Sequence, residues 1–406
     1  MISALGLAAL GLLSAAILYF ERTLSSKRSA VAAAALIAFA MLLRGICMEH
    51  ETLDYQNFLT VWVDYFRDNG GFAALRQSIG NYNVPYLYFL AAFSYLDTAP
   101  LVPIKLLSVF FDILLAWGVM RIVYLYRPTH GAVLSAFFIT LFLPTVVLNG
   151  AYWGQCDSIY AAFAVWSIYF ALSRHPVLSM LFISLSFSFK LQAVFIMPVF
   201  LIFIFAGRIK WRHLPVFALG YIGAMLPAVA AGRPFWDTLT VYFNQASSVG
   251  SALNYNSSSV FAFVSRDADG TMCSALGIAA AFAFLILVFV WAFFTRERLT
   301  DRALLAFTLL IALGVPFFLP HMHDRYFFLS DVLSAALAVV VPQLALVPLC
   351  VSFGSLLGYY AYLVGRFLLP MRYGAAAMVI ALLLLFVYIL LFRDTRPARR
   401  PERQRR

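Results

Sequence analysis

Long apolar runs separated by short polar stretches make up almost the whole chain. Runs of about 17–25 apolar residues have the length that an α-helix needs to cross roughly 30 Å of hydrocarbon, and the alternation expected of barrel strands is absent. The pattern predicts an all-α polytopic membrane protein with about thirteen transmembrane helices. The expected crossings are 2–20, 29–47, 101–124, 131–149, 157–173, 177–189, 191–206, 214–231, 272–295, 302–319, 327–343, 344–364 and 373–392.

Two neighbouring runs, 177–189 and 191–206, are shorter than the others, and Pro198 interrupts the second. Half-length or broken helices occur around the sites of transporters and membrane enzymes. The pattern therefore predicts two short helices here or a single re-entrant hairpin.

Lys and Arg are concentrated in short loops around 22–28, 121–127, 208–212 and 296–302, and in the stretch 393–406. Because short cytoplasmic loops carry the excess of basic residues, these segments are expected in the cytoplasm. The amino terminus is then expected outside, together with 48–100, 150–156, Lys190, 232–271, 320–326 and 365–372.

The chain is expected to form one transmembrane catalytic domain over 1–392, followed by a basic cytoplasmic tail at 393–406. The first run has no basic residues before it, which favours a retained helix over a secretory signal. Two long extracytoplasmic loops are predicted, at 48–100 and 232–271. In the first, Phe58, Trp62 and Tyr65 share a helical stripe typical of an interfacial helix, and a second apolar helix is expected after Pro85.

Composition narrows the function classes. Of the 406 residues, 63% are hydrophobic and 12% charged, so the bilayer is the solvent for most of the chain. The formal charge of +11 is explained largely by the cytoplasmic loops and the tail, so no nucleic-acid partner is expected. Four scattered cysteines suggest neither a zinc ribbon nor a disulfide framework.

Asp54 lies a few residues beyond the second predicted helix, at the start of the interfacial helix. A carboxylate there can face both an aqueous acceptor and the headgroup of a lipid-linked donor, which suits a general base. The alternative is an N-cap of the interfacial helix, and the two roles are compatible.

A second polar cluster contains His321, His323, Asp324 and Arg325. Arginine binds phosphate oxygens with a fixed fork of donors, and a histidine can donate to phosphate or titrate near neutrality. The alternative is that these residues cap helix ends at the interface.

A divalent metal is a further alternative, because nitrogen and oxygen ligands are available near both clusters, although their spacing defines no coordination sphere. The candidate ligands are Glu49, His50, Glu51, His321 and His323.

Asp157 and Lys190 are ionisable residues at predicted helix ends. Asp157 is either a functional residue or an ordinary N-cap. A lone lysine at this depth is costly unless it snorkels or pairs, so an anionic headgroup is the expected partner of Lys190.

Five segments together resemble bacterial membrane proteins related to the second mannosyltransferase of glycosylphosphatidylinositol anchor synthesis, which are GT-C glycosyltransferases. They are LDYQNFL (53–59), NYNVPYLY (81–88), YWGQCDS (152–158), FKLQA (189–193) and HMHDRYF (321–327). The resemblance extends over 29–345. It implies a GT-C-like fold, a polyprenyl-phosphate sugar donor and catalysis on the extracytoplasmic side.

The resemblance also implies roles. The first-loop acidic position falls on Asp54, which would deprotonate the acceptor hydroxyl. The late element places His323 or His321, with Arg325 and Tyr326, near the lipid phosphate. Many relatives have Glu before the arginine, whereas this chain has Asp324, whose side chain is one methylene shorter.

The expected reaction is a direct, inverting displacement at the anomeric carbon, with Lys190 as a further phosphate ligand. It requires no covalent intermediate and no organic cofactor. The candidate substrate contacts are Asn81, Asn83, Tyr86, Tyr152, Trp153, Gln155, Asp157 and Gln192.

The sequence therefore predicts a hexosyltransferase of the bacterial inner membrane, with mannose as the sugar suggested by the resemblance. Its acceptor is an extracytoplasmic glycan, lipid or protein. A transporter or flippase of lipid-linked sugars and a glycan polymerase are the alternatives. A flippase is expected to carry charge along the membrane interior, whereas the candidate residues here gather on one face.

Overall fold

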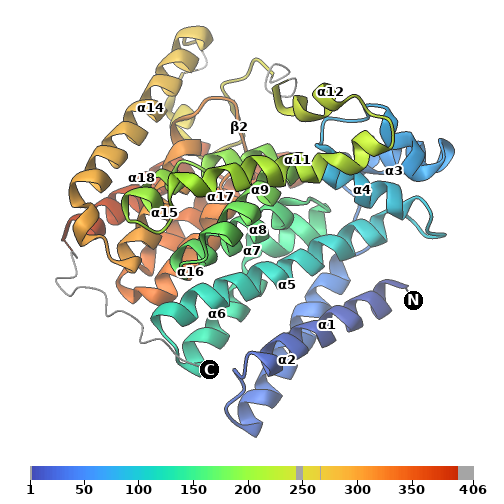
Figure 1. The fold of residues 1–406 in the computed structure, drawn as a ribbon, viewed down its shortest axis with the longest axis horizontal. Helices are drawn as coiled ribbons and strands as arrows, with labels where there is room; N and C mark the ends of the chain where they lie inside the picture. The colour runs from blue at the N-terminus through green and yellow to red at the C-terminus, as the bar shows by residue number, and fades with distance from the viewer. Residues whose placement is uncertain (1, 244–249, 266, 392–406) are drawn as a thin grey trace.

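The computed structural model describes residues 2–243, 250–265 and 267–391, and these form a bundle of helices with very little strand (Figure 1). The predicted tail at 393–406 lies outside the described residues. The amino-terminal pair α1 (Ile2–Phe20) and α2 (Lys27–Cys47) packs along one side of the bundle, against α5 (Leu101–Tyr126).

The long helices follow the predicted crossings closely. Besides α1, α2 and α5 they are α11 (Leu214–Ala230), α14 (Gly270–Thr295), α15 (Asp301–Phe318), α17 (Leu346–Val364) and α18 (Met371–Leu391). Within the described ranges, these eight helices are long and apolar enough to cross a membrane. The prediction of an all-α polytopic membrane protein is confirmed, while the number of thirteen crossings stays a prediction.

The remaining predicted crossings form shorter or broken helices. Those in one piece are α8 (Asp157–Leu172), α9 (Pro176–Phe189) and α16 (Phe328–Val340). The segment predicted as 131–149 is α6 (His130–Phe142), followed after a 47° bend by α7 (Pro144–Val147) and the π-helical turn η3 (Leu148–Trp153). Pro144 has no N–H for helix hydrogen bonding, which explains the break.

The segment predicted as 191–206 is also divided. It begins with the 3₁₀ helix η4 (Leu191–Phe195) and continues as the seven-residue helix α10 (Val199–Phe205). Pro198 precedes α10 directly, where its ring is tolerated because the first helical N–H groups need no partner within the helix.

The first long loop contains η1 (Tyr55–Leu59), α3 (Thr60–Asp68), η2 (Gly71–Arg76) and α4 (Val84–Phe93). The second apolar helix expected after Pro85 is present as α4, but it begins at Val84, with Asn83 as its cap and Pro85 in its first turn. Trp62 of α3 is buried against Phe58 and Tyr82, with ring centroids 6.0 and 5.5 Å away. The helices of this loop are present, and their place in the membrane interface stays a prediction.

The second long loop contains α12 (Phe235–Leu239), the short strand β1 (Asn254–Tyr255) and η6 (Val260–Phe263). Strand β1 pairs in parallel with β2 (Met322–His323), so that Tyr255 lies opposite His323. This pairing attaches the second loop to the histidine segment.

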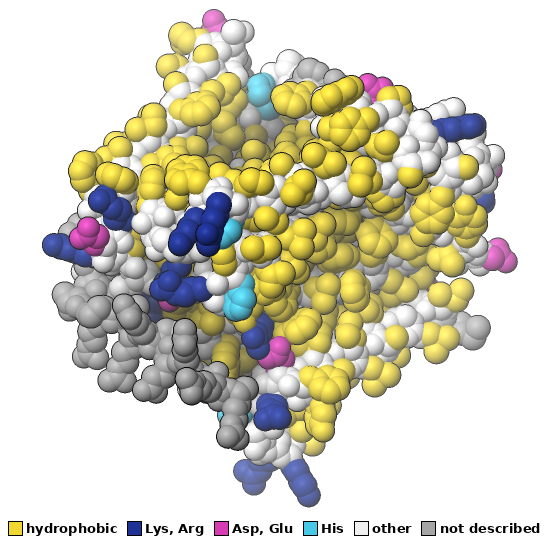
Figure 2. Space-filling view, in the orientation of Figure 1, with side chains coloured by type: hydrophobic (Ala, Val, Ile, Leu, Met, Phe, Trp, Pro, Cys, Tyr) yellow, Lys and Arg dark blue, Asp and Glu magenta, His cyan; other side chains and the backbone are white. Residues whose placement is uncertain are grey.

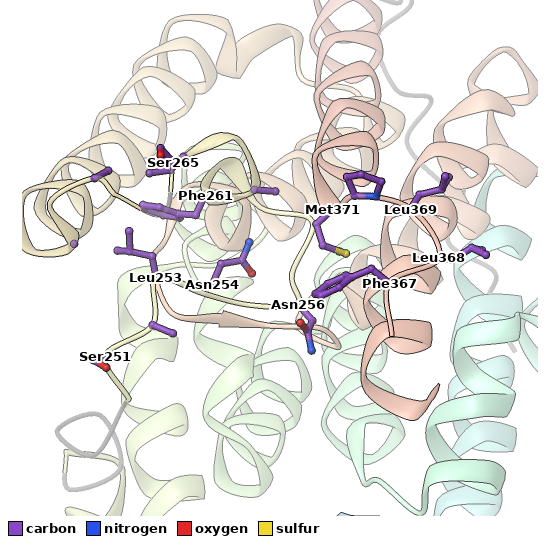
Figure 3. Close-up of a pocket in the computed structure, with 16 residues that line it drawn as sticks. Ser251, Leu253, Asn254, Asn256, Phe261, Ser265, Phe367, Leu368, Leu369 and Met371 are labelled. Atoms are coloured by element: carbon purple, nitrogen blue, oxygen red, sulfur yellow. The ribbon is translucent and has the colours of Figure 1, made fainter. Parts of the chain in front are cut away.

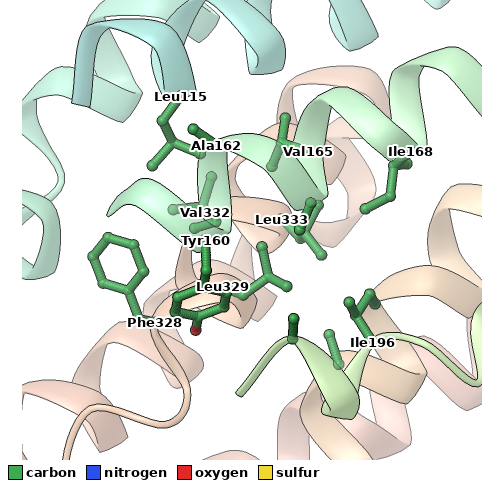
Figure 4. Close-up of a cluster of buried hydrophobic side chains, with 14 of the residues drawn as sticks. Leu115, Tyr160, Ala162, Val165, Ile168, Ile196, Phe328, Leu329, Val332 and Leu333 are labelled. Carbon is green, nitrogen blue, oxygen red and sulfur yellow. The ribbon is translucent and has the colours of Figure 1, made fainter. Parts of the chain in front are cut away.

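The core of the bundle is formed by α5, α8 and α16. Leu115 of α5, Val165 of α8 and Leu333 of α16 belong to one buried cluster, together with Ile196 (Figure 4). Large apolar side chains elsewhere point outward, and they cover much of the face in Figure 2. Apolar surface on this scale suits contact with lipid.

The basic loops predicted to be cytoplasmic meet at one end of the bundle. Arg121 pairs with Glu21 at 2.8 Å, Arg208 pairs with Asp301, and the His130 ring contacts the carbonyl of Thr23. Lys and Arg side chains gather toward the lower left of Figure 2, and the polar clusters of Asp54 and Arg325 belong to the opposite set of loops. The membrane side that each end faces stays a prediction.

An ion pair that the sequence analysis did not single out lies inside the bundle. Arg44 of α2 donates to Oδ2 of Asp112 in α5 from Nη2 at 2.8 Å and from Nε at 3.1 Å, and both side chains are fully buried. Nη2 of Arg44 also donates to the carbonyl of Leu141, and Ser158 donates to Asp112. Arg44 and Asp112 are not among the predicted site residues, and their burial is tolerated because their donors and acceptors satisfy one another.

Candidate active site

Asp54 is held by three neutral donors from distant parts of the chain. Its Oδ2 accepts from Nε1 of Trp153 at 2.9 Å and from Nε2 of Gln155 at 2.5 Å, and its Oδ1 accepts from the hydroxyl of Tyr362 at 2.6 Å. The carboxylate makes no capping hydrogen bond to the helix that starts there. The alternative of an N-cap is therefore wrong for Asp54.

The two carboxylate oxygens of Asp54 accept different numbers of hydrogen bonds within the protein. A carboxylate has about four lone-pair positions. Oδ2 accepts two hydrogen bonds, while Oδ1 accepts one. Since the side chain is 18% exposed, Oδ1 is the atom of Asp54 with a lone pair available to a substrate proton.

Arg325 lies between the carboxylates of the site. Its Nη1 is 4.0 Å from Oδ2 of Asp54 and 3.7 Å from Oδ1 of Asp324, and its Nε is 3.6 Å from Oδ2 of Asp157. The guanidinium carbon is 5.2 Å from the ring centroid of Trp153. Nε is buried and has no hydrogen-bond partner among the described residues. Three carboxylates within 4.0 Å thus compensate the charge of the guanidinium, while its Nε makes no hydrogen bond, so the group retains donor capacity for an anion.

Asp157 and Lys190 form a buried ion pair. Asp157 is the first residue of α8, and its Oδ2 also accepts from Nδ2 of Asn149 at 2.7 Å. Lys190 follows the last residue of α9, and its ammonium lies 5.6 Å from the ring centroid of Tyr82. Asp157 is therefore the first residue of the helix rather than its N-cap, and the partner of Lys190 within the protein is Asp157.

A cavity of about 690 Å³ opens beside Arg325 and Lys190. Six other residues predicted for the site also line it: Asn81, Asn83, Gln192, His321, His323 and Tyr326. Much of the remaining wall is apolar, with Phe189, Leu191, Val194, Phe195, Ile278 and Leu319. The cavity thus combines cationic and amide side chains with an apolar wall, which is the chemistry of a site for an amphiphile with an anionic headgroup.

The other predicted substrate contacts have partners within the protein. Trp153 and Gln155 bind Asp54, and Gln155 also accepts from the hydroxyl of Tyr82 at 3.1 Å. Tyr86 is buried beside Tyr82, with 5.0 Å between their ring centroids. Tyr152 stacks on His50 at 3.8 Å and does not line the cavity.

The two histidines of the late cluster differ. Nδ1 of His321 is 2.8 Å from the carbonyl of Ala252 and Nε2 is 3.4 Å from Oγ of Ser274, so its ring holds the second loop in place. The His323 ring stacks on Tyr255 at 4.6 Å. Burial, followed by the charge of Arg325, lowers the pKa of His323 to about 4. His323 is therefore neutral at pH 7 and can donate a hydrogen bond without adding charge.

Asp324 is buried and does not line the cavity. It is 3% exposed and packs against α17, where a Cβ at Gly358 would come within 3.2 Å of it. Burial raises the pKa of Asp324 to about 7, against the opposing charge of Arg325. The short side chain thus belongs to the support of Arg325 and does not line the cavity.

The residues considered as metal ligands do not converge. His50 stacks on Tyr152, and Glu51 accepts from Gln56 at 3.1 Å. Among the residues that the structure describes, no three His, Cys, Asp or Glu side chains are grouped as a metal site. The four cysteines are free thiols: Cys47, Cys156, Cys273 and Cys350.

Sequence reasoning missed several residues of this arrangement. Tyr82 lies within the segment 81–88, whose resemblance could have pointed to it. Asn149, which orders Asp157, and Tyr359, whose hydroxyl accepts from Asn149 at 3.0 Å, carry no local signal. Tyr362 lies near the end of an apolar helix, where a tyrosine is expected at the interface in any case.

The fold and the site together define a helical membrane protein whose carboxylates and cations meet at one end of the bundle, beside an apolar cavity. Residues 81–320 match the family model of glycosyltransferase family 87, which is a GT-C-type family, and the match covers more than half of the chain. The chain belongs to this family and is a membrane glycosyltransferase. The matched range contains Asp157 and Lys190, whereas Asp54 precedes it and Arg325 follows it. No curated protein matches the chain.

Proposed function

We propose that this glycosyltransferase moves a hexose, with mannose as the first candidate, from a polyprenyl-phosphate donor to a hydroxyl group of a glycan, lipid or protein. The observation that carries the proposal is the 4.0 Å separation between Oδ2 of Asp54 and Nη1 of Arg325, which lines the cavity together with Lys190. Asp54 does not itself line the cavity, and Arg325, which does, lies beside it, so we propose that one substrate meets a base and two phosphate-binding cations there.

In the proposed reaction, Oδ1 of Asp54 takes the proton of the acceptor hydroxyl. The acceptor oxygen forms a bond to the anomeric carbon, and the bond from that carbon to the phosphate oxygen breaks with its electron pair on the phosphate. The configuration inverts because attack and departure occur on opposite faces. The products are the glycoside, the polyprenyl phosphate and a protonated Asp54, and no organic cofactor takes part.

Arg325 and Lys190 are proposed to stabilise the charge that develops on the departing phosphate. Nε of Arg325 makes no hydrogen bond among the described residues, although Oδ2 of Asp157 lies 3.6 Å away, and an ammonium has three donors, of which Asp157 receives one from Lys190. Donors already in place cost little reorganisation when charge develops, so they lower the barrier. His323 is proposed to add a neutral hydrogen bond.

The apolar wall of the cavity supports a lipid-linked donor. Ile278 belongs to α14, most of whose apolar side chains are exposed, so the wall continues toward a surface suited to lipid. We place catalysis on the extracytoplasmic side of the bacterial inner membrane, in one domain over 1–392 with a cytoplasmic tail. A transporter would use the same cations, but membership of a glycosyltransferase family favours transfer.

The test measures product formation by the purified protein with polyprenyl-phosphate mannose, and with the corresponding glucose lipid, across a panel of acceptor alcohols. Asp54→Asn is expected to reduce turnover by about 10²–10⁴-fold while donor binding is retained, since the amide cannot accept the proton. The control is Asp64→Asn, which removes an exposed carboxylate of α3 that pairs with Arg67. Full turnover in Asp54→Asn would refute the role of this residue. Binding of donor without transfer to any acceptor would favour the transporter.

A further inference from the structure

One tyrosine of the site contacts both the support of the proposed base and a proposed phosphate ligand. The hydroxyl of Tyr82 lies 3.1 Å from Oε1 of Gln155, whose Nε2 donates to Oδ2 of Asp54. The ring centroid of Tyr82 lies 5.6 Å from the ammonium of Lys190, and Tyr82 also lines the cavity beside Arg325 and Lys190. The proposed reaction does not yet assign a role to this tyrosine.

Tyr82 does not line the larger cavity, of about 900 Å³, which lies between the second loop and the segment 367–371 (Figure 3). Asn254 and Asn256 on one side and Phe367 and Met371 on the other line that cavity. None of the described residues that line it is charged, and none of them donates to Asp54. The contacts of Tyr82 therefore belong to the smaller cavity with its two cations.

The direction of the hydrogen bonds from Tyr82 to Asp54 follows from the chemistry of the partners. An ionised carboxylate only accepts hydrogen bonds, so the Gln155 amide must turn Nε2 toward Asp54 and Oε1 toward Tyr82. The Tyr82 hydroxyl is then the donor to Oε1. Because Gln155 is 3% exposed, Oε1 has little access to water as a replacement for this donor.

The backbone of Gln155 is already fixed, so only its side chain needs orienting. Its N–H donates to the carbonyl of Asn149 at 2.9 Å, and its carbonyl accepts from the hydroxyl of Ser108 at 2.7 Å. The Tyr82 hydroxyl holds the far end of the side chain. Loss of this hydroxyl is therefore expected to loosen the amide that donates to Asp54, while the chain around it stays in place.

The first loop holds the Tyr82 ring. The ring packs against Trp62 and Tyr86, with 5.5 and 5.0 Å between the centroids. A Cβ at Gly80 would come within 2.5 Å of the Trp62 ring, and the φ of Gly80 is 63°, in the left-handed region that glycine adopts without strain. The segment thus folds closely around Trp62 and fixes Tyr82 in the wall of the cavity.

The contact between the Tyr82 ring and Lys190 is attractive. An ammonium within about 6 Å of an aromatic centroid is attracted by the negative face of the ring, and more strongly where water is excluded. Lys190 is buried and pairs with Asp157, so the ring is a second partner that consumes none of its hydrogen-bond donors. The remaining donors of Lys190 stay available to a phosphate.

We propose that Tyr82 is a positioning residue for both halves of the transfer reaction. Its hydroxyl orients the Gln155 amide and, through it, Asp54, while its ring holds Lys190 toward the departing phosphate. One side chain thus sets the separation between the base and a phosphate ligand, and correct separation lowers the barrier of the chemical step. The inference rests on the proposed roles of Asp54 and Lys190.

Two replacements in the purified full chain separate the hydroxyl from the ring. Tyr82→Phe is expected to lower kcat about tenfold, with the donor Kd, titrated without acceptor, within about twofold of wild type. Tyr82→Leu is expected to lower kcat at least as much and to weaken donor binding about three- to tenfold, because the ring is lost. If Tyr82→Leu does not fold, Tyr82→Met removes the ring instead.

The matched control is Tyr65→Phe. It removes another hydrogen bond from a tyrosine hydroxyl to a glutamine, that of Tyr65 to Gln77 at 2.6 Å, in the same loop but exposed. Both kcat and donor Kd are expected to stay at wild-type values in this variant. A merely structural role of Tyr82 would lower its unfolding temperature without separating kcat from donor binding.

Double variants test whether Tyr82 acts through Gln155 and Asp54. Gln155→Leu is expected to lower kcat at least as much as Tyr82→Phe, and adding Tyr82→Phe to Gln155→Leu or to Asp54→Asn is expected to lower it no further, since the same contact is already lost. Wild-type kcat in Tyr82→Phe, or losses that multiply in the double variants, would overturn the proposal. So would donor binding weakened equally in Tyr82→Phe and Tyr82→Leu, which would make the hydroxyl a donor contact. Full turnover in Asp54→Asn alone would instead refute the proposed base, so the two failures are distinguishable.

Discussion

The hydroxyl of Tyr362 donates to Oδ1 of Asp54 across 2.6 Å, although the two residues are 308 positions apart in the chain. The Tyr362 ring also stacks on Trp153 with 4.5 Å between the centroids, and Trp153 donates to the other oxygen of Asp54. The end of α17 thus closes the site over the first loop, and it fixes the direction in which the free lone pair of Oδ1 points.

Replacing Tyr362 by Phe tests this arrangement, because the ring stack remains while one hydrogen bond to Asp54 is lost. A carboxylate held by fewer donors is less well oriented, so we expect kcat to fall about 10–100-fold with the donor KM within about twofold of wild type. Initial rates over a range of donor concentrations measure both. Tyr360→Phe, which removes a hydroxyl that contacts Arg366, is the control. A change confined to KM would show that Tyr362 binds donor instead.

For the buried pair of Lys190 and Asp157, we expect protein stability and donor affinity to respond differently to replacement. Lys190→Met leaves Asp157 charged with only partial compensation, which is expected to destabilise the protein by about 3–5 kcal/mol. In the double variant Lys190→Met, Asp157→Asn the charge is removed, so most of the stability is expected to return. Donor affinity is expected to stay reduced, because a phosphate ligand is absent from both variants. Thermal unfolding and a donor titration measure the two effects, and recovery of donor affinity in the double variant would contradict the phosphate-binding role.

Lys105 is predicted to position Asp54 without contacting it. Its ammonium donates to the carbonyls of Cys47 at 2.7 Å and His50 at 2.5 Å, in the segment that leads to Asp54. In Lys105→Met these carbonyls lose their donor, and we expect kcat to fall about tenfold or more while donor affinity is unchanged, since Lys190 and Arg325 belong to other segments. Lys105→Arg retains a cation and is expected to restore part of kcat. An equal loss of donor affinity in Lys105→Met would indicate a general structural defect.

The neighbouring residues His323 and Asp324 are expected to change the stability of the protein with pH in opposite directions. Burial lowers the pKa of His323 from 6.5 to about 4, so the unfolded chain binds the extra proton and the stability from this group is lost as pH falls through this window. Burial raises the pKa of Asp324 from 3.8 to about 7, so the folded chain binds the extra proton and the stability from this group is lost as pH rises through 7.

The two effects offset each other in the wild type, and single replacements are expected to expose them. Between about pH 4 and 6.5, His323→Gln is expected to lose stability as pH rises and Asp324→Asn to gain it, each by on the order of 3 kcal/mol. Unfolding temperatures at fixed salt and detergent across pH 4–8 provide the measurement. Parallel profiles for the two variants would contradict the assigned directions.

The helices themselves follow closely from the sequence. The run 101–124 forms α5 over Leu101–Tyr126, and the run 373–392 forms α18 over Met371–Leu391. A segment in lipid must satisfy its backbone internally, so a long apolar run has few alternatives to a helix. The interruption at a proline was also predicted from the sequence, since Pro198 divides the segment 191–206 as expected.

The contacts between helices could not be predicted from the sequence in the way that the helices themselves were. The segment 53–59 and the segment 321–327 each drew attention to a charged residue, but the 4.0 Å separation of Asp54 and Arg325 depends on how the bundle packs. The ion pair of Arg44 and Asp112 joins two runs that look like ordinary crossings, and neither run by itself indicates that these two charges meet.

By itself, the sequence determined that this protein is a helical membrane protein, where most helices begin and end, and which polar segments interrupt the apolar runs. Local hydrophobicity decides these properties, because the bilayer imposes the same requirement on every segment. Only the tertiary structure decided that Tyr362, Trp153 and Gln155 meet at Asp54, and that the Tyr82 hydroxyl contacts Gln155. Such contacts depend on the close fit of side chains between helices distant in sequence, and no local pattern encodes that fit.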